Sequence, residues 1–155
     1  MSEENNNQEN ANVPAIVINT QYVKDLSLEI PFAPEIFREI NSAPKMDINV
    51  DVKAEHLHDN FFNVSLSIKM DGVVNEKKLF ILELVYAAVV SLNVPQEHVE
   101  PVLLVEIPRM IFPFARSIIT NNLGEGGLPP FMLNPIDFVA MYQARKNAQD
   151  NQPKD

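Results

Sequence analysis

The chain has 155 residues, of which 46% are hydrophobic and 21% charged, a composition typical of one globular domain with its own core. The formal net charge of −9 argues against a general nucleic-acid binder, because an acidic surface repels phosphate backbones. The absence of cysteine excludes disulfides, thiolate catalysis and cysteine-ligated zinc. The longest apolar run, LFILELVYAAVVSL, is short for a membrane span and contains a glutamate, so we expect a soluble protein without direct membrane insertion.

Both ends of the chain are polar. Residues 1–13 are acidic and rich in Asn, and they lack the basic and apolar regions of a signal peptide. Residues 147–155 are also polar. We predict disordered tails over these two stretches and a single folded domain over residues 14–146.

Apolar and polar residues alternate in three segments, as in strands that bury one face of a sheet. In the first, Ile16, Ile18, Tyr22, Leu26, Leu28 and Ile30 are predicted to share one face, and Asn19, Gln21, Asp25, Ser27 and Glu29 the other. Val23 and Lys24 break this alternation locally. The second and third strands are predicted over 46–52 and 62–70, and PFAPEIF, between the first two strands, predicts a turn or short helix.

The run LFILELVYAAVV, residues 79–90, alternates less and predicts a fourth strand that is covered on both faces. AEHLHDN and the Asp-Gly pair of DGVVNEKK predict the turns on either side of the third strand. Short turns between neighbouring strands favour an antiparallel meander.

The segment SLNVPQEHVEPVLLVEIP shows no clear period and predicts a long irregular crossover. IPRMIFPFARSIIT, residues 107–120, predicts a first helix with Pro113 in its opening turn and Gly124 at its end. Asn134 and Pro135 predict the N-cap and first residue of a second helix. The predicted fold class is therefore α+β, a four-stranded antiparallel sheet packed with two C-terminal helices, and its large apolar surface indicates an oligomer.

No group of residues has the pattern of a catalytic or metal site. His56 and His58 stand beside Asp59, but no further ligand is near them in sequence, so we interpret them as exposed turn residues. Asp47 and Asp51 would be about 13 Å apart on one strand, too far for paired-carboxylate catalysis. We predict no enzyme, no metal and no cofactor, and the residues alone indicate a binding module of unknown partner.

Three stretches resemble the SecB family of bacterial protein-export chaperones, in the family's order and spacing. They are YVKDLSLEIP (22–31), IPRMIFPFARSIIT (107–120) and GGLPPFMLNPIDFVAMY (126–142). The resemblance covers roughly residues 16–145. It implies a cytoplasmic, ATP-independent holdase without cofactor, which binds unfolded precursor proteins and delivers them to the SecA translocase motor. It also implies a homotetramer built as a dimer of dimers.

The resemblance also implies sites. The SecA contact is expected at Asp25, Glu29, Ile81 and Glu83 on the outer sheet face, where the alternative is that these residues only solubilise the sheet. We predict a client groove that includes Met46, Ile48, Val50, Leu103, Leu104, Phe131 and Leu133, although a core role is an equal alternative for them. We predict subunit contacts through Leu82, Leu84, Tyr86, Ile111, Phe114 and Ile118.

Two alternatives belong to other classes. A SecB-like scaffold with one dedicated client, such as a chaperone linked to a toxin–antitoxin pair, would be favoured by a helical C-terminal extension, and the short polar tail argues against it. A small enzyme is disfavoured because no catalytic constellation is present. The crossover is also richer in proline and poorer in glycine than the family pattern, which bears on the shape of the groove.

Overall fold

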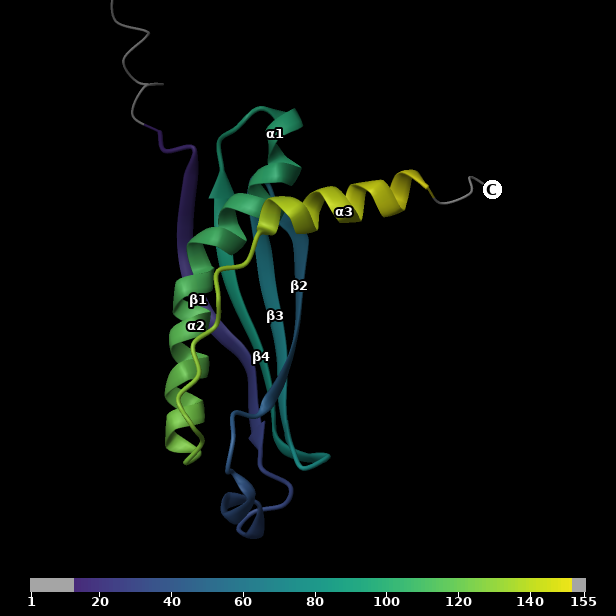
Figure 1. The fold of residues 1–155 in the computed structure, drawn as a ribbon. Helices are drawn as coiled ribbons and strands as arrows, with labels where there is room; N and C mark the ends of the chain where they lie inside the picture. Colours follow the sequence, from purple (N-terminus) through teal and green to yellow (C-terminus); the bar gives the residue numbers. More distant parts are fainter. Residues whose placement is uncertain (1–12, 152–155) are drawn as a thin grey trace, which may run out of the picture.

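The computed structural model describes residues 13–151, so the predicted tail residues 1–12 and 152–155 lie outside the described part of the chain. Four antiparallel strands form one sheet in the order β1–β4–β3–β2 (Figure 1). The strands are β1 (Ile16–Glu29), β2 (Lys45–His58), β3 (Phe61–Val74) and β4 (Lys77–Leu92), and the helices are α1 (Gln96–Pro101), α2 (Ile107–Glu125) and α3 (Phe138–Asp150). A 3₁₀ turn, η2 (Glu35–Glu39), and a π-helical stretch, η3 (Val102–Glu106), complete the elements, and the predicted fold class is confirmed.

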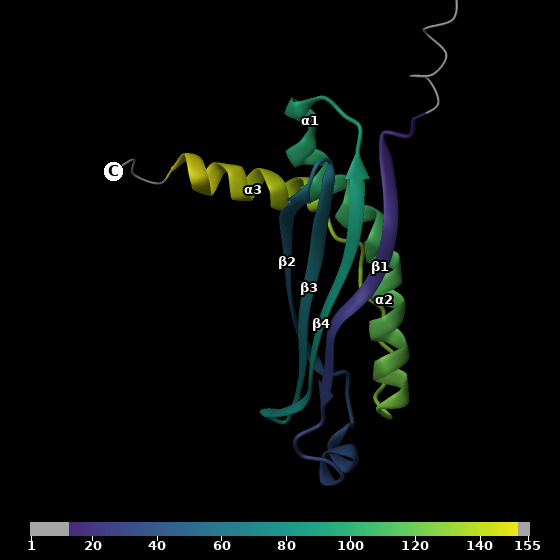
Figure 2. The ribbon, with the colours of Figure 1, turned by 180° about the vertical axis from the view of Figure 1, so that it is seen from behind.

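The two faces of the sheet have different surroundings. α2 lies along one face on the side of β1 and β4, and the chain after it returns beside α2 before α3 projects sideways past β2 (Figure 1). No helix within residues 13–151 lies on the other face (Figure 2). We call these the helix face and the open face. The β1–β2 connection with η2 lies at one end of the sheet, and α1 lies at the opposite end.

Both hairpins turn within the segments predicted to connect their strands, but each turn is shorter than its predicted segment. β2 continues through the predicted AEHLHDN connection to His58, and the chain reverses at Asp59, whose φ is 48°. The β3–β4 hairpin turns at Asn75 and Glu76, with φ of 50° and 65°, which is the left-handed geometry that two-residue hairpins need to match strand twist. The second, third and fourth strands are consequently longer than predicted.

Gly72 lies inside β3, opposite Met46, and not in a turn. A Cβ atom at this position would lie 2.7 Å from Cε1 of Phe80, so glycine is needed for the buried ring to pack against the strand. The prediction of a turn at this Asp-Gly pair is therefore wrong.

β1 changes the face of two predicted residues because its pairing with β4 shifts register twice, between Ile18 and Thr20 and between Val23 and Asp25. Each shift is a β-bulge, which inserts one unpaired residue and reverses the alternation beyond it. Gln21 consequently lies opposite Ala88 on the helix face. The predicted placement of Tyr22 on the apolar face is wrong, because its hydroxyl donates to Oδ1 of Asn63 at 2.7 Å on the open face. The second bulge coincides with the local break noted at Val23 and Lys24.

The predicted irregular crossover is instead a continuous helical rod formed by α1, η3 and α2. The backbone N–H of Ile107 donates to the carbonyl of Val102, five residues earlier, which is the π-helical pattern. In a regular α-helix the ring of Pro108 would clash with the carbonyl of Leu104, and the wider π turn gives that carbonyl room. Pro113 therefore lies in the middle of a long rod and not in an opening turn.

α3 begins at Phe138, later than predicted. Its N-cap is Asp137, whose Oδ1 accepts from the backbone N–H of Ala140 at 3.0 Å. Residues 134–137 are not helical, so the predicted N-cap at Asn134 is wrong. α3 continues to Asp150 and so runs past residue 146, where we predicted the domain to end. An Arg145 Nη1 hydrogen bond of 2.8 Å to the carbonyl of Val52 ties α3 to β2.

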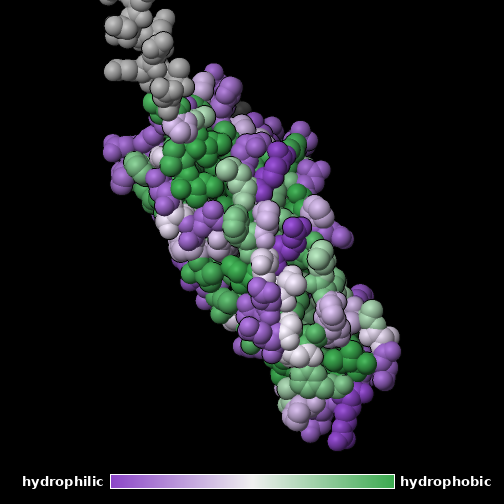
Figure 3. Space-filling view, turned by 90° about the vertical axis from the view of Figure 1, so that its left-hand side faces the viewer, coloured by the Kyte–Doolittle hydropathy of each residue, from purple (hydrophilic) through white to green (hydrophobic). Residues whose placement is uncertain are grey.

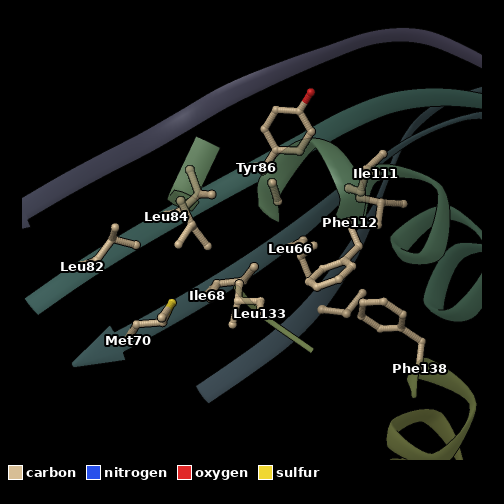
Figure 4. Packing of buried hydrophobic residues seen from close by; sticks show 14 of the residues in the cluster. Leu66, Ile68, Met70, Leu82, Leu84, Tyr86, Ile111, Phe112, Leu133 and Phe138 are labelled. Atoms are coloured by element: carbon tan, nitrogen blue, oxygen red, sulfur yellow. The ribbon is translucent and has the colours of Figure 1, made fainter. Parts of the chain in front are cut away.

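The core lies between the helix face and α2, with the α2–α3 connection and α3 closing it at the side (Figure 4). Leu66 and Leu84 of the sheet are 0% and 1% exposed, and the rings of Phe112 and Phe138 meet edge-on with centroids 6.0 Å apart. On the open face of β4, Ile81, Val85 and Val89 are only partly buried by their neighbours. The fourth strand is therefore covered by helices on one face, and not on both as predicted.

Candidate binding surfaces

The open face is predominantly acidic. Strand register places on it seven carboxylates and four lysines: Asp25, Glu29, Asp47, Asp51, Glu55, Asp71 and Glu83, with Lys45, Lys53, Lys69 and Lys78. Small and hydroxyl side chains such as Ser65, Ser67 and Ala87 lie between them. An acidic surface of this kind favours a basic partner.

The four residues predicted for the SecA contact all lie on this face, on the adjacent strands β1 and β4. Glu29 lies opposite Ile81, and Asp25 lies opposite Val85. Val85 and Glu83 are two residues apart on β4 and so point to the same face. Asp25, Glu29 and Glu83 are exposed, whereas Ile81 is half-buried. The structure therefore brings these side chains together on one accessible surface.

A shallow hollow of about 250 Å³ lies within the open face. Its lining includes the carboxylates of Asp25, Asp51 and Glu83 together with Lys69. The Nζ atom of Lys69 is 3.5 Å from Oε1 of Glu83, across the β3–β4 pair. A second ion pair, Lys78 Nζ to Asp71 Oδ1 at 3.0 Å, lies farther along the same strands.

The predicted groove residues divide into two groups. Met46, Ile48 and Val50 lie on the helix face of β2, which is an edge strand, and they remain partly accessible. Leu103 and Leu133 are only 5% and 3% exposed, and so belong to the core of the chain. Leu104 and Phe131 are half-buried at its margin.

Leu104 lines two adjoining hollows between β2, the helical rod and α3. One, of about 280 Å³, is bounded by Val52, Met141 and Tyr142, and the other, of about 450 Å³, includes Val99, Pro101 and Lys146. Apolar side chains and a few charges line both. These hollows could accept apolar side chains of a bound polypeptide.

Sequence reasoning missed a third hollow, of about 490 Å³, at the opposite end of the helix face. The β1–β2 connection forms it, and its lining includes Pro31, Phe32, Ile36 and Lys77. Phe32 is 49% exposed, and Phe37 in the same connection is 39% exposed. The signal was present in PFAPEIF, where two aromatic residues occur in a short, proline-stiffened connection that buries only Ile36.

The predicted subunit contacts also divide. Leu82, Leu84 and Ile111 are 0%, 1% and 0% exposed, because they fill the space between β4 and α2 within one chain. Tyr86 is buried with them, and burial raises the pKa of its phenol above the ordinary value near 10. Phe114, by contrast, is 52% exposed on α2, and Ile118 is half-buried. The accessible part of the predicted contact is thus the outer side of α2.

His56 and His58 lie at the end of β2 and not in a turn, and their rings pack against Phe62 and Phe61. Within residues 13–151, no three His, Cys, Asp or Glu side chains gather in a metal-binding arrangement. No helix in this part of the chain is both long and apolar enough to cross a membrane.

The fold and its acidic open face define an α+β binding protein, and comparison with known proteins identifies its family. The family model described as preprotein translocase subunit SecB matches residues 8–149. The protein-export protein SecB of Rhodospirillum rubrum is 48% identical over 137 residues, covering 88% of this chain and 86% of the relative. That of Paramagnetospirillum magneticum is 47% identical over 144 residues, covering 90% of this chain and 93% of the relative.

The chain therefore belongs to the SecB family, and it is a protein-export chaperone and not an enzyme. Among solved structures, the SecB-like chaperone Rv1957 of Mycobacterium tuberculosis, determined with a peptide of the HigA1 antitoxin, matches with a TM-score of 0.66 at 14% identity. The match covers 79% of this chain and 91% of that one. At this identity the similarity concerns the fold.

Proposed function

We propose that this chain keeps precursor proteins unfolded in the cytoplasm without ATP, and that it passes them to SecA through the open face of its sheet. The observation that carries the proposal is the contrast between the two faces. One is acidic, and the other is bordered by hollows in which apolar and charged side chains lie together. A chaperone that holds one partner while docking on another needs two such separate surfaces.

We place the client along the helix face of β2. Met46, Ile48 and Val50 form a partly accessible row there, which leads from the hollow beside η2 toward the hollows beside α3. From Met46 to Ala54 the strand rises about 27 Å, enough for roughly eight residues of an extended client. The apolar row and the apolar residues in the hollows at both of its ends favour extended, hydrophobic segments with little sequence specificity. Several weak contacts along one client add through multivalency.

We place SecA on the open face, at Asp25, Glu29, Ile81 and Glu83. The excess of carboxylates favours a basic segment of the partner, and because the residues are solvent-exposed, the attraction should weaken as salt is added. Ile81 supplies an apolar contact beside Glu29, its cross-strand neighbour.

We propose that the chain assembles as a homotetramer, a dimer of dimers, through the exposed apolar residues of β1 and α2. Val23 and Leu26 are 45% and 38% exposed on the helix face of β1, and Met110 and Phe114 are 43% and 52% exposed on α2. Hydrophobic side chains form patches on this side of the molecule (Figure 3). A second copy of the chain would remove these patches from water.

The test is calorimetric titration of the purified protein with one export precursor, once unfolded and once native, in the absence of nucleotide. Binding to the unfolded form alone supports the proposal, and binding to neither form contradicts it. Ile48→Asp and Asn49→Asp form a matched pair, since they place the same carboxylate on opposite faces of β2. We expect the first to weaken client binding by about tenfold, the effect of roughly 1.4 kcal/mol from a carboxylate that must be desolvated. Asn49→Asp should leave client binding unchanged.

A further inference from the structure

We propose that Lys69 acts as an internal competitor for the basic partner at the open face. Its ammonium group occupies the place that a cation of the partner would take, and it thereby limits the affinity of docking. This inference rests on the proposed docking of SecA at Glu83, and it assigns to Lys69 a role in setting how tightly that docking occurs.

The pairing of Lys69 with Glu83 is fixed by the backbone. The two residues are direct cross-strand neighbours in the β3–β4 ladder. Side chains in such positions start from Cβ atoms only about 4.5–5.5 Å apart, so they meet without any rearrangement of the main chain. The 3.5 Å distance between Nζ and Oε1 is therefore a consequence of register.

The position of Lys69 within the hollow decides what it competes with. Three carboxylates, of Asp25, Asp51 and Glu83, line the hollow, and Lys69 is the one basic side chain in its lining. A lysine or arginine of a partner that approaches these carboxylates meets the Lys69 ammonium group there. Docking at Glu83 therefore requires that Lys69 be displaced, or that the partner pay for placing two cations side by side.

The Lys69–Glu83 pair is suited to exchange because it is weak. Its side chains are 57% and 48% exposed, and solvent screening leaves such pairs with little net stability. A partner can therefore replace Lys69 at low cost, and Lys69 can return when the partner leaves. Because a guanidinium binds a carboxylate through two parallel hydrogen bonds, arginine should displace Lys69 better than lysine does.

Lys53 provides the matched control. It lies on the same open face, on β2 opposite Ser65, whereas Lys69 lies four residues farther along β3. Four residues of strand correspond to about 14 Å, which exceeds the screening length of about 8 Å at physiological salt. Removing the charge of Lys53 changes the net charge of the face equally but leaves Glu83 paired.

The experiment measures the dissociation constant of purified SecA, at low and physiological salt, for the full chain and its variants. We expect Lys69→Gln to tighten binding by about threefold to fivefold, the range that a released surface ion pair allows. Lys53→Gln should tighten it by less than about twofold, because its charge is screened from Glu83. Lys69→Arg, which keeps the positive charge, should bind SecA with the affinity of the unchanged chain or more weakly. In a Glu83→Gln background, the effect of Lys69→Gln should fall to that of Lys53→Gln.

Equal effects of Lys69→Gln and Lys53→Gln would show that only net charge matters, and would overturn the inference. Weaker binding by Lys69→Gln would also overturn it. Glu29→Lys with Glu83→Lys separates this failure from a failure of the docking surface. If the double variant still binds SecA normally, the docking surface is wrong and the inference falls with it. If the double variant loses SecA binding while the two lysine variants agree, the inference alone fails.

Discussion

The two faces of β4 differ although they belong to the same sixteen residues of strand. Leu82 and Leu84 on the helix face are 0% and 1% exposed, while Glu83 between them is exposed to solvent. Alternation of side chains along a strand allows one segment to anchor the core and carry a binding surface at once. Substitutions on one face should therefore change stability, and those on the other should change recognition.

The largest effect should come from the buried face. Leu84→Ala removes a side chain packed against α2 and leaves a cavity, so we expect a loss of about 2–5 kcal/mol in the free energy of unfolding. Denaturant titration measures this loss. Glu83→Gln, one residue away, should change the free energy by no more than about 0.5 kcal/mol. If the two substitutions cost the same, the separation of roles between the faces is contradicted.

Charge reversal on the open face tests the other half of the comparison. Glu29→Lys combined with Glu83→Lys replaces attraction by repulsion at two points, so SecA binding should weaken by about a hundredfold or more. Binding of an unfolded client and the mass of the assembly should remain as before. A loss of client binding in this variant would mean that the two surfaces are coupled.

The third substitution distinguishes the outer side of α2 from the core. Phe114→Asp places a charge on an exposed patch and removes a ring that a second copy of the chain would cover. We expect it to weaken each subunit contact by about 2 kcal/mol. Light scattering should then show smaller assemblies of still-folded chains. Tyr86→Asp, by contrast, should unfold the chain, because it puts a carboxylate into the core. An unchanged mass for Phe114→Asp would exclude α2 from the contact.

The smallest effect concerns Tyr86, whose hydroxyl donates to Oε1 of Gln21 at 3.0 Å. Tyr86→Phe should cost about 1 kcal/mol at neutral pH. Since burial raises the pKa of Tyr86 in the folded chain, the unfolded chain loses this proton first, and the contribution to stability is present below pH 10 and declines above it. Tyr86→Phe should therefore flatten the decline of stability above pH 10. Tyr22→Phe, which loses a similar hydrogen bond on the open face, controls for loss of the hydroxyl.

The sequence predicts the sheet and its polar outer face because alternation is a direct result of half-burial. It fails where one extra residue changes the pattern. At Gln21 and Tyr22 the two bulges of β1 exchange the faces, and only pairing with β4 shows this. At Gly72 the Asp-Gly pair predicts a turn, but the glycine instead makes room for the ring of Phe80. Turn propensity considers only the residues next to one another in sequence, so it does not include this contact.

The helical rod was obscured by its prolines. Leu103, Ile107, Ile111, Ala115, Ile119 and Leu123 recur at every fourth position and are all buried, so a helical period was present in the sequence. Pro101 and Pro108 interrupt it and favour an irregular reading, but a π turn between them tolerates the second proline. The exposure of single residues in the rod could not be predicted either. Ile111 and Phe114 are both apolar, but Ile111 lies on the side of α2 that faces the sheet and Phe114 lies on the side that faces solvent. The groove and contact residues were assigned without that information.

The π turn also determines where this chain can change in length. A π turn holds one residue more than an α turn, so a single deletion within Val102–Glu106, combined with replacement of Pro108, would leave an ordinary helix with its flanking parts in their present orientation. α2 has no extra residue of this kind, so a single deletion within it would rotate the residues beyond the deletion by about 100° around the helix axis. Ile119 and Leu123 would then leave the sheet. Natural length variation in the rod should therefore be concentrated in these five residues.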